Sequence, residues 1–143
     1  MIRVVFACVH NAGRSQIAAA WFNRLADPLK AQAVSAGTQP ADHVHPVVIE
    51  AMKEKGLDLS GAEPRLLTLE LAKGAAFLIT MGCGEDCPYI PGVPVLDWPL
   101  PDPKGQGIES VRVIRDDVES RVRAFVKQNA WGREDRPEAL PSD

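Results

Sequence analysis

Cys8-Val9-His10-Asn11-Ala12-Gly13-Arg14-Ser15 is the stretch that decides the fold. It follows the apolar run Ile2 to Ala7 and precedes a segment of helical character that begins with Gln16. This order predicts a strand, a loop and a helix in direct succession. In such a turn, the N–H groups of the loop and of the first helical turn converge where the helix dipole favours an anion. We therefore expect an oxyanion site built from Val9, His10, Asn11, Ala12, Gly13 and Arg14.

Three side chains give this loop its chemistry. Five residues separate Cys8 from Arg14, so the guanidinium can close over a bound oxyanion with two parallel hydrogen bonds. The field that holds the oxyanion also stabilises a thiolate, which makes Cys8 the expected nucleophile, and Ser15 can donate its hydroxyl to the sulfur. The alternative is a buried structural cysteine followed by an N-capping serine. The arginine at this spacing, between a strand and a helix, argues against it.

The composition is that of an ordinary globular protein. The 143 residues are 45% hydrophobic and 24% charged, with 16 basic and 19 acidic side chains and a net charge of -3. This near-neutral balance disfavours a nucleic-acid or anionic-membrane partner. The N-terminus lacks a signal-peptide pattern and no stretch approaches roughly 18 apolar residues, so we expect no membrane association and a reducing, cytoplasmic setting. Three cysteines in such a chain favour reactive thiols over a disulfide scaffold.

Apolar runs that alternate with helical patterns predict an α/β fold. The expected strands are residues 2–7, 31–35, 75–81 and 93–96, and the expected helices are 14–26, 46–56, 68–73 and 108–128. This alternation implies a three-layer sandwich, in which helices cover both faces of a four-stranded parallel sheet. A site at the switch point between the first and third strands gives the order 2-1-3-4. We expect one catalytic domain over residues 1–130 and a polar C-terminal tail over 131–143.

The loop resembles the signature loop of the low-molecular-weight tyrosine phosphatase superfamily. That superfamily carries Cys-x5-Arg-Ser near its N-terminus, and the form Cys-Val-His-Asn-Ala-Gly-Arg-Ser-Gln is similar to its arsenate reductase branch. The resemblance covers about residues 2–128 and implies the same phosphatase-like fold. It also implies a general-acid loop with the sequence Asp-Pro, which Asp102 and Pro103 match.

The chemistry calls for a carboxylic acid above the anion, because a leaving hydroxide or alkoxide must be protonated. Asp102 is the candidate favoured by the resemblance. Asp97 is its rival, although a position at the end of a predicted strand favours a structural capping role for Asp97.

Two further cysteines follow the third predicted strand. Open parallel sheets place their sites beyond the carboxyl ends of the strands, so Cys83 and Cys87 should lie on the same edge as Cys8. Their segment resembles the resolving-cysteine segment of thioredoxin-linked arsenate reductases, although those proteins separate the two cysteines by more residues. The alternatives are a structural zinc site completed by Cys8 and His10, or two unconnected thiols.

Two chemistries fit these residues, and they share a first step. The Cys8 thiolate attacks a tetrahedral centre, Arg14 and the loop hold the charge, and Asp102 protonates the leaving group. Arsenate reduction then needs a second thiol that takes the Cys8 sulfur and expels arsenite. We expect Cys83 to do this and Cys87 to free Cys8 afterwards, with thioredoxin or a related dithiol protein as reductant. Phosphate or sulfate should bind as analogues of arsenate. The alternatives are a phosphotyrosine phosphatase, a reductase that depends on a low-molecular-weight thiol, and a non-enzymatic anion sensor.

We expect no cofactor and no metal ion. His43 and His45 are one residue apart and are followed by a proline, which is typical of a loop that enters a helix. Some reductases of the branch that the loop resembles bind a monovalent cation through an acidic residue of the first helix. Ala19 occupies the matching position here, so no such ion is predicted.

Overall fold

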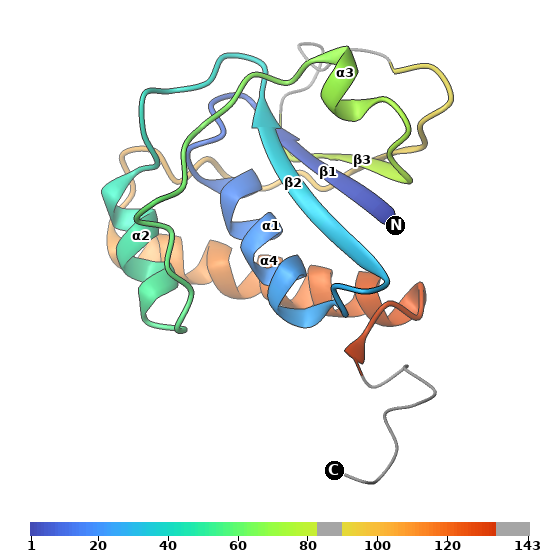
Figure 1. Cartoon of the computed structure of the whole chain (residues 1–143). Coiled ribbons are helices and arrows are strands. Elements are labelled where there is room, and N and C mark those ends of the chain that lie inside the picture. The colour runs from blue at the N-terminus through green and yellow to red at the C-terminus, as the bar shows by residue number, and fades with distance from the viewer. Residues whose placement is uncertain (83–89, 134–143) are drawn as a thin grey trace, which may run out of the picture.

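A computed structural model of the chain describes residues 1–82 and 90–133. In this part of the chain the sheet consists of β1 (Ile2–Cys8), β2 (Ala31–Gly37), β3 (Phe77–Thr80) and β4 (Val95–Asp97). The strands are all parallel and lie in the order β2-β1-β3-β4, which confirms the predicted topology (Figure 1). The helices are α1 (Arg14–Leu25), α2 (Pro46–Lys53), α3 (Leu69–Ala72) and α4 (Ile108–Gln128).

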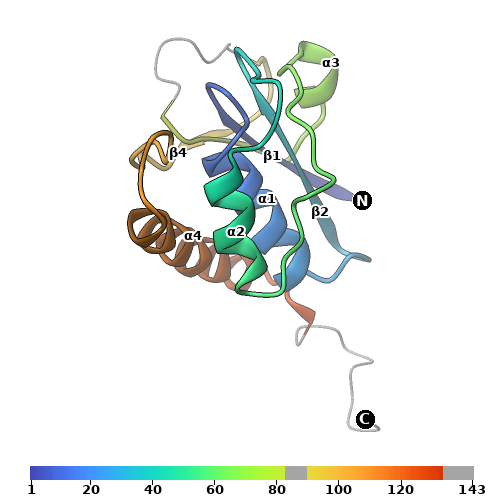
Figure 2. The same cartoon turned by 90° about the vertical axis from the view of Figure 1, so that its left-hand side faces the viewer.

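The two faces of β1 build two separate hydrophobic clusters. Val4 and Phe6 belong to the larger cluster, which includes side chains of α1, α2 and α4. Val5 and Ala7 point to the opposite face, where they join residues from the segment around α3, such as Leu67. Figures 1 and 2 show the same arrangement, with α1, α2 and α4 on one side of the sheet and α3 on the other. The alternation along a strand explains why Ile2 to Ala7 is almost continuously apolar.

Tertiary pairing moves several element ends from their predicted positions. β2 continues to Gly37, beyond the predicted residue 35, because its parallel pairing with β1 extends to the Cys8–Gly37 pair. β3 is shorter than predicted, since Ala75 still belongs to the turn that leaves α3, where its N–H donates to the Ala72 carbonyl at 3.1 Å. The amphipathic pattern of residues 108–128 predicted α4 without error.

An aromatic cluster fills the space between the sheet and α4. Phe125 lies at its centre, with ring centroids 5.7 Å from Trp98, 5.3 Å from Phe77 and 5.6 Å from Trp131. Trp98 therefore packs into the core, as expected by default, and Trp21 and Phe22 are buried as predicted. No helix among residues 1–82 and 90–133 is long and apolar enough to cross a membrane.

A buried arginine joins α2 to α4. Arg115 donates to the Ala51 carbonyl at 2.8 Å and to the Glu54 carboxylate at 2.7 Å. Arg112, one turn earlier on α4, donates to the same carboxylate at 2.6 Å. The hydrogen bonds from Arg112 and then Arg115 lower the pKa of Glu54 to about 2. The carboxylate thus remains charged and paired across most of the pH range.

Candidate active site

The oxyanion loop, residues 8–15, lies at the carboxyl end of β1 and runs into α1 (Figure 1). Its carbonyl groups are held by the neighbouring segment 38–45, whose N–H groups donate to the carbonyls of Cys8, Val9, His10 and Ala12 at 2.8–3.2 Å. In the described part of the chain, the N–H groups of residues 10–13 donate to no backbone carbonyl. The loop therefore has its acceptors occupied and its donors free, as an anion site requires.

The Cys8 sulfur lies 2.8 Å from the Ser15 hydroxyl, and the hydrogen-bond network around them allows Ser15 to donate to the sulfur. The Arg65 backbone N–H can only donate, and it lies 3.0 Å from the side-chain oxygen of Asn11. The amide nitrogen of Asn11 must then face Ser15, whose oxygen it reaches at 2.7 Å. Because Ser15 accepts that bond, its own proton is free to point at Cys8. Both groups are buried, so this hydrogen bond is shielded from water.

Asn11 is a residue whose importance the sequence reasoning missed. It was expected only as one member of the oxyanion loop, yet it orients the serine that contacts the sulfur. Its φ of 50° is left-handed, a conformation that asparagine tolerates better than other side chains. An asparagine in a tight loop is the signal that could have indicated this position.

Arg14 has one edge fixed and the other edge open. Its Nη1 donates to the Leu100 carbonyl at 3.1 Å, and its Nη2 lies 3.7 Å from the Asp102 carboxylate. Its Nε is buried and, among the described residues, has no hydrogen-bond partner. A buried N–H without a partner is costly, and Nε and Nη2 form the edge that binds oxyanions with two parallel bonds. This edge is where two oxygens of a tetrahedral oxyanion would accept hydrogen bonds.

The acid loop, residues 99–105, packs directly on the oxyanion loop. Pro103 is buried against Gly13, where a Cβ would come within 2.5 Å of its Cγ. Asp102 is 44% exposed, and its carboxylate accepts a 2.9 Å hydrogen bond from the Lys104 N–H. The structure thus brings Asp102 to Arg14. Asp97, its rival, accepts a 2.8 Å hydrogen bond from the Thr80 hydroxyl within the sheet, which is a structural role.

Histidines line one wall beside the oxyanion loop. His10, His43, His45 and Lys104 share a pocket of about 380 Å³. Burial lowers the pKa of His45, and the nearby Asp102 carboxylate opposes part of that shift. Within residues 1–82 and 90–133, no three His, Cys, Asp or Glu side chains gather in a way that could hold a metal ion.

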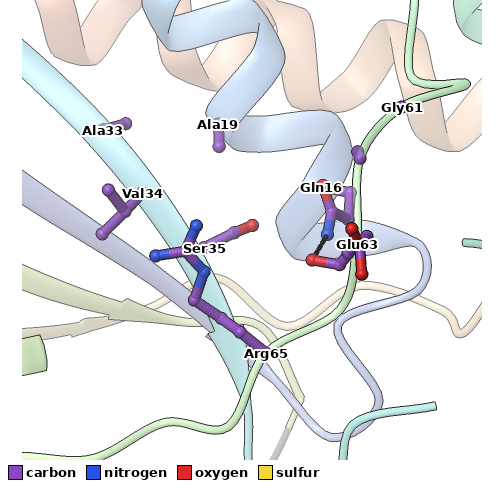
Figure 3. Close-up of a pocket in the computed structure, with 9 residues that line it drawn as sticks. Gln16, Ala19, Ala33, Val34, Ser35, Gly61, Glu63 and Arg65 are labelled. Atoms are coloured by element: carbon purple, nitrogen blue, oxygen red, sulfur yellow. Dashed lines mark hydrogen bonds between the residues drawn. The ribbon is translucent and has the colours of Figure 1, made fainter. Parts of the chain in front are cut away.

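A second pocket, of about 360 Å³, lies beside α1 at Ala19 (Figure 3). The Gln16 amide fills the space between this pocket and the oxyanion loop, and it donates to the main-chain and side-chain oxygens of Asn11 at 3.1 and 3.2 Å. Oxygens that already accept N–H bonds are poor cation ligands, and Ala19 offers none. The other lining residues include Ser35, Gly61, Glu63 and Arg65.

Cys83 and Cys87 lie outside the described residues, so their predicted approach to Cys8 and the alternative zinc site are predictions without a structural test. Gly82, the residue before Cys83, is described. It follows the end of β3 and has a left-handed φ of 99°.

Comparisons with known proteins agree with this geometry. The family model described as low molecular weight phosphotyrosine protein phosphatase matches residues 3–134. A protein of Halobacterium salinarum, provisionally named an arsenate reductase, is 44% identical over 123 residues, which are 82% of this chain and 85% of that protein.

Two solved structures extend the comparison. A thioredoxin-dependent arsenate reductase of Corynebacterium glutamicum is 39% identical with a TM-score of 0.77; the match covers 90% of this chain but 61% of that one. An arsenate reductase in its oxidized state is 31% identical with a TM-score of 0.78, over 90% of this chain and 98% of the other. The predicted fold is confirmed by these similarities.

Proposed function

The chain belongs to the low molecular weight phosphotyrosine protein phosphatase family, and we propose that it reduces arsenate to arsenite in arsenic detoxification. One observation carries the proposal: a buried cysteine sulfur lies 2.8 Å from a serine hydroxyl, in a loop that also holds the buried Nε of Arg14, which has no hydrogen-bond partner among the described residues. A nucleophile thus faces a place where a tetrahedral oxyanion would bind. The similarity to proteins named arsenate reductases supports arsenate as that oxyanion.

In the first step, the Cys8 thiolate attacks arsenic and forms a sulfur–arsenic bond. A hydroxyl group leaves as water after it takes a proton from Asp102, and the arsenic remains As(V). The loop N–H groups and the open edge of Arg14 stabilise the negative charge on the remaining oxygens.

In the second step, the Cys83 thiolate attacks the Cys8 sulfur. The electron pair of the sulfur–arsenic bond goes to arsenic, which leaves as As(III) arsenite, and a Cys8–Cys83 disulfide forms. Cys87 then attacks Cys83 and frees Cys8, so the two electrons come from the thiols of Cys83 and Cys87. Both cysteines follow β3, and parallel strands bring their carboxyl ends to the edge that carries Cys8.

The reductant that we propose is thioredoxin or a related dithiol protein. It would reduce the Cys83–Cys87 disulfide by thiol–disulfide exchange. The similarity to a thioredoxin-dependent reductase of Corynebacterium glutamicum supports this choice. Because such a relay needs a reducing compartment, we infer that the protein acts in the cytoplasm.

The experiment compares reductants and substrates in one assay series. Reduced protein is mixed with arsenate and one of two reducing systems: thioredoxin, thioredoxin reductase and NADPH, or glutaredoxin, glutathione, glutathione reductase and NADPH. Arsenate-dependent NADPH oxidation is followed in both. Hydrolysis of p-nitrophenyl phosphate is measured in parallel. We expect arsenate reduction with thioredoxin and only weak phosphatase activity. Efficient phosphatase activity without arsenate reduction by either system would show that the protein is a phosphatase.

A further inference from the structure

We propose that Gly82 is a positioning residue for Arg14: its missing side chain leaves the space in which the guanidinium lies. An ideal Cβ at Gly82 would overlap Arg14 Nη1 and would come within 3.3 Å of Cζ. The left-handed φ of 99° directs this empty side-chain position at the arginine. A glycine is thus required twice, once for its backbone conformation and once for the contact. The inference rests on the proposed use of Arg14 in oxyanion binding.

Two main-chain segments contact Nη1 of the guanidinium. An ideal Cβ at Gly82 would lie 3.8 Å from the Leu100 carbonyl oxygen, which accepts the hydrogen bond from Nη1 at 3.1 Å. These two segments follow the neighbouring strands β3 and β4. Both are tied to the sheet, because the Met81 N–H donates to the Ala7 carbonyl and the Trp98 N–H donates to the Thr80 carbonyl, each at 2.8 Å.

These contacts of Nη1 determine which edge of Arg14 faces the oxyanion. With Nη1 beside Gly82 and bonded to the Leu100 carbonyl, the edge formed by Nε and Nη2 is the one offered to a ligand. Nε is the buried donor that has no partner among the described residues, and Nη2 lies 3.7 Å from the Asp102 carboxylate. A side chain at residue 82 would push the guanidinium out of this orientation. Both parallel hydrogen bonds to the oxyanion would then be lost or misdirected.

The chain provides matched control positions for backbone strain. Gly74 has a φ of 80° and Gly92 a φ of 81°, and at either site an added Cβ meets no atom of the described residues within 4 Å. Alanine at Gly74 or Gly92 therefore introduces left-handed strain without the contact to Arg14. These variants show how much strain of this kind affects the protein when no such contact is made.

The test measures binding of inorganic phosphate, which requires no turnover. The dissociation constant follows from protection of Cys8 against iodoacetamide, with Cys8 modification read by peptide mass. We expect Gly82→Ala to weaken phosphate binding on the order of tenfold to a hundredfold. Gly74→Ala should bind phosphate as the natural protein does. Equal phosphate affinity in the Gly82→Ala variant and the natural protein would overturn the proposal.

A double-variant cycle shows whether Gly82 acts through the arginine. In an Arg14→Ala background, Gly82→Ala should cost no further phosphate affinity, and a full additional loss would contradict the proposal. If Gly82→Ala alone does not fold, it is combined with Arg14→Lys, whose single ammonium lacks the overlapping nitrogen. Recovery of folding supports the proposal, and a double variant that also fails to fold contradicts it. Because the readout is phosphate binding and not turnover, a protein that does not reduce arsenate could still confirm or contradict the role of Gly82.

Discussion

The oxyanion loop and the acid loop meet at the contact between Gly13 and Pro103, but they are held in very different ways. In the oxyanion loop, Cys8, Asn11 and Ser15 are buried and linked by hydrogen bonds of 2.7–2.8 Å. In the acid loop, Asp102 is 44% exposed and lies 3.7 Å from its ion-pair partner.

This contrast separates binding from proton transfer. The nucleophile and the anion site are arranged before any substrate arrives, so removing one of their groups should affect binding or thiolate reactivity directly. Asp102 has few contacts and faces solvent, so changes at the acid loop should affect turnover while phosphate binding remains near normal.

Removal of the sulfur should have the largest effect. Cys8→Ser is expected to lower arsenite formation by about 10⁴-fold or more, because the hydroxyl is a far weaker nucleophile than the thiolate. Phosphate should still bind, since the loop and Arg14 remain, and calorimetry measures this binding. Measurable catalysis by the Cys8→Ser variant would show that another thiol attacks the substrate.

Loss of the acid should come next. Asp102→Asn is expected to lower kcat by roughly 10²–10⁴-fold, because no proton reaches the leaving group, while phosphate affinity changes little. Asp97→Asn is the control, and it should reduce stability through its bond to Thr80 rather than turnover. Steady-state kinetics of both variants show which of the two carboxylates acts as the general acid. Turnover close to normal in Asp102→Asn would remove Asp102 from the general-acid role.

The Asn11 side chain should matter for the reactivity of the sulfur. Asn11→Gly keeps the left-handed backbone but removes the amide that orients Ser15. We expect Cys8 to be alkylated about tenfold to a hundredfold more slowly at pH 7, because the thiolate loses an oriented hydrogen bond. Ser15→Ala should give a loss of similar size. An unchanged alkylation rate in Asn11→Gly would mean that the network does not act on the sulfur.

The contact between the two loops should affect turnover to a smaller extent. Gly13 has a φ of -145°, so alanine introduces no left-handed strain, but its Cβ would push against Pro103. We expect Gly13→Ala to lower kcat about tenfold by moving Asp102, with no change in Cys8 alkylation. Gly107→Ala serves as control, because an added Cβ there meets no atom of residues 1–82 and 90–133 within 4 Å. A large change in alkylation instead would show that the loops are not separable.

The ion pairs between α2 and α4 should affect stability alone. The pKa of Glu54 falls from 4.5 to about 2 on folding, so the pairing stabilises the fold fully above pH 4.5 and is lost as the pH falls toward 2. Glu54→Gln should lower the melting temperature at pH 7. The difference in melting temperature between this variant and the natural protein should shrink as the pH falls from 4.5 to 2. Kinetic constants at pH 7 should not change. A difference in melting temperature that stays the same size at pH 2 would show that Glu54 stabilises the fold through packing and not through its charge.

Much of this architecture could be predicted from local sequence patterns. The strand, loop and helix around Cys8 follow from an apolar run, a glycine and an alanine-rich segment, which act over short distances. The helix over residues 108–128 was predicted without error because five apolar side chains repeat at helical spacing. The choice of Asp102 over Asp97 rested on the Asp-Pro sequence, and the structure gives Asp97 another partner.

The contacts that orient the site could not be predicted in the same way. Asn11 depends on the Arg65 N–H, and Arg14 depends on Gly82 and the Leu100 carbonyl. These partners are distant in sequence, and two of the three use main-chain atoms that any residue carries. Such contacts follow from the packing of loops at the sheet edge, where no periodic pattern of side chains records them.

The measurement that tests arsenate reduction by Cys8 most directly is a single turnover without external thiol. Fully reduced natural protein, Cys83→Ser and Cys87→Ser are each mixed with arsenate, and arsenite release and disulfide mass are followed together. We predict one arsenite per natural chain and a Cys8–Cys83 disulfide trapped in Cys87→Ser. If no arsenite appears until a small thiol is added, and Cys83→Ser then behaves like the natural protein, the intramolecular relay is contradicted.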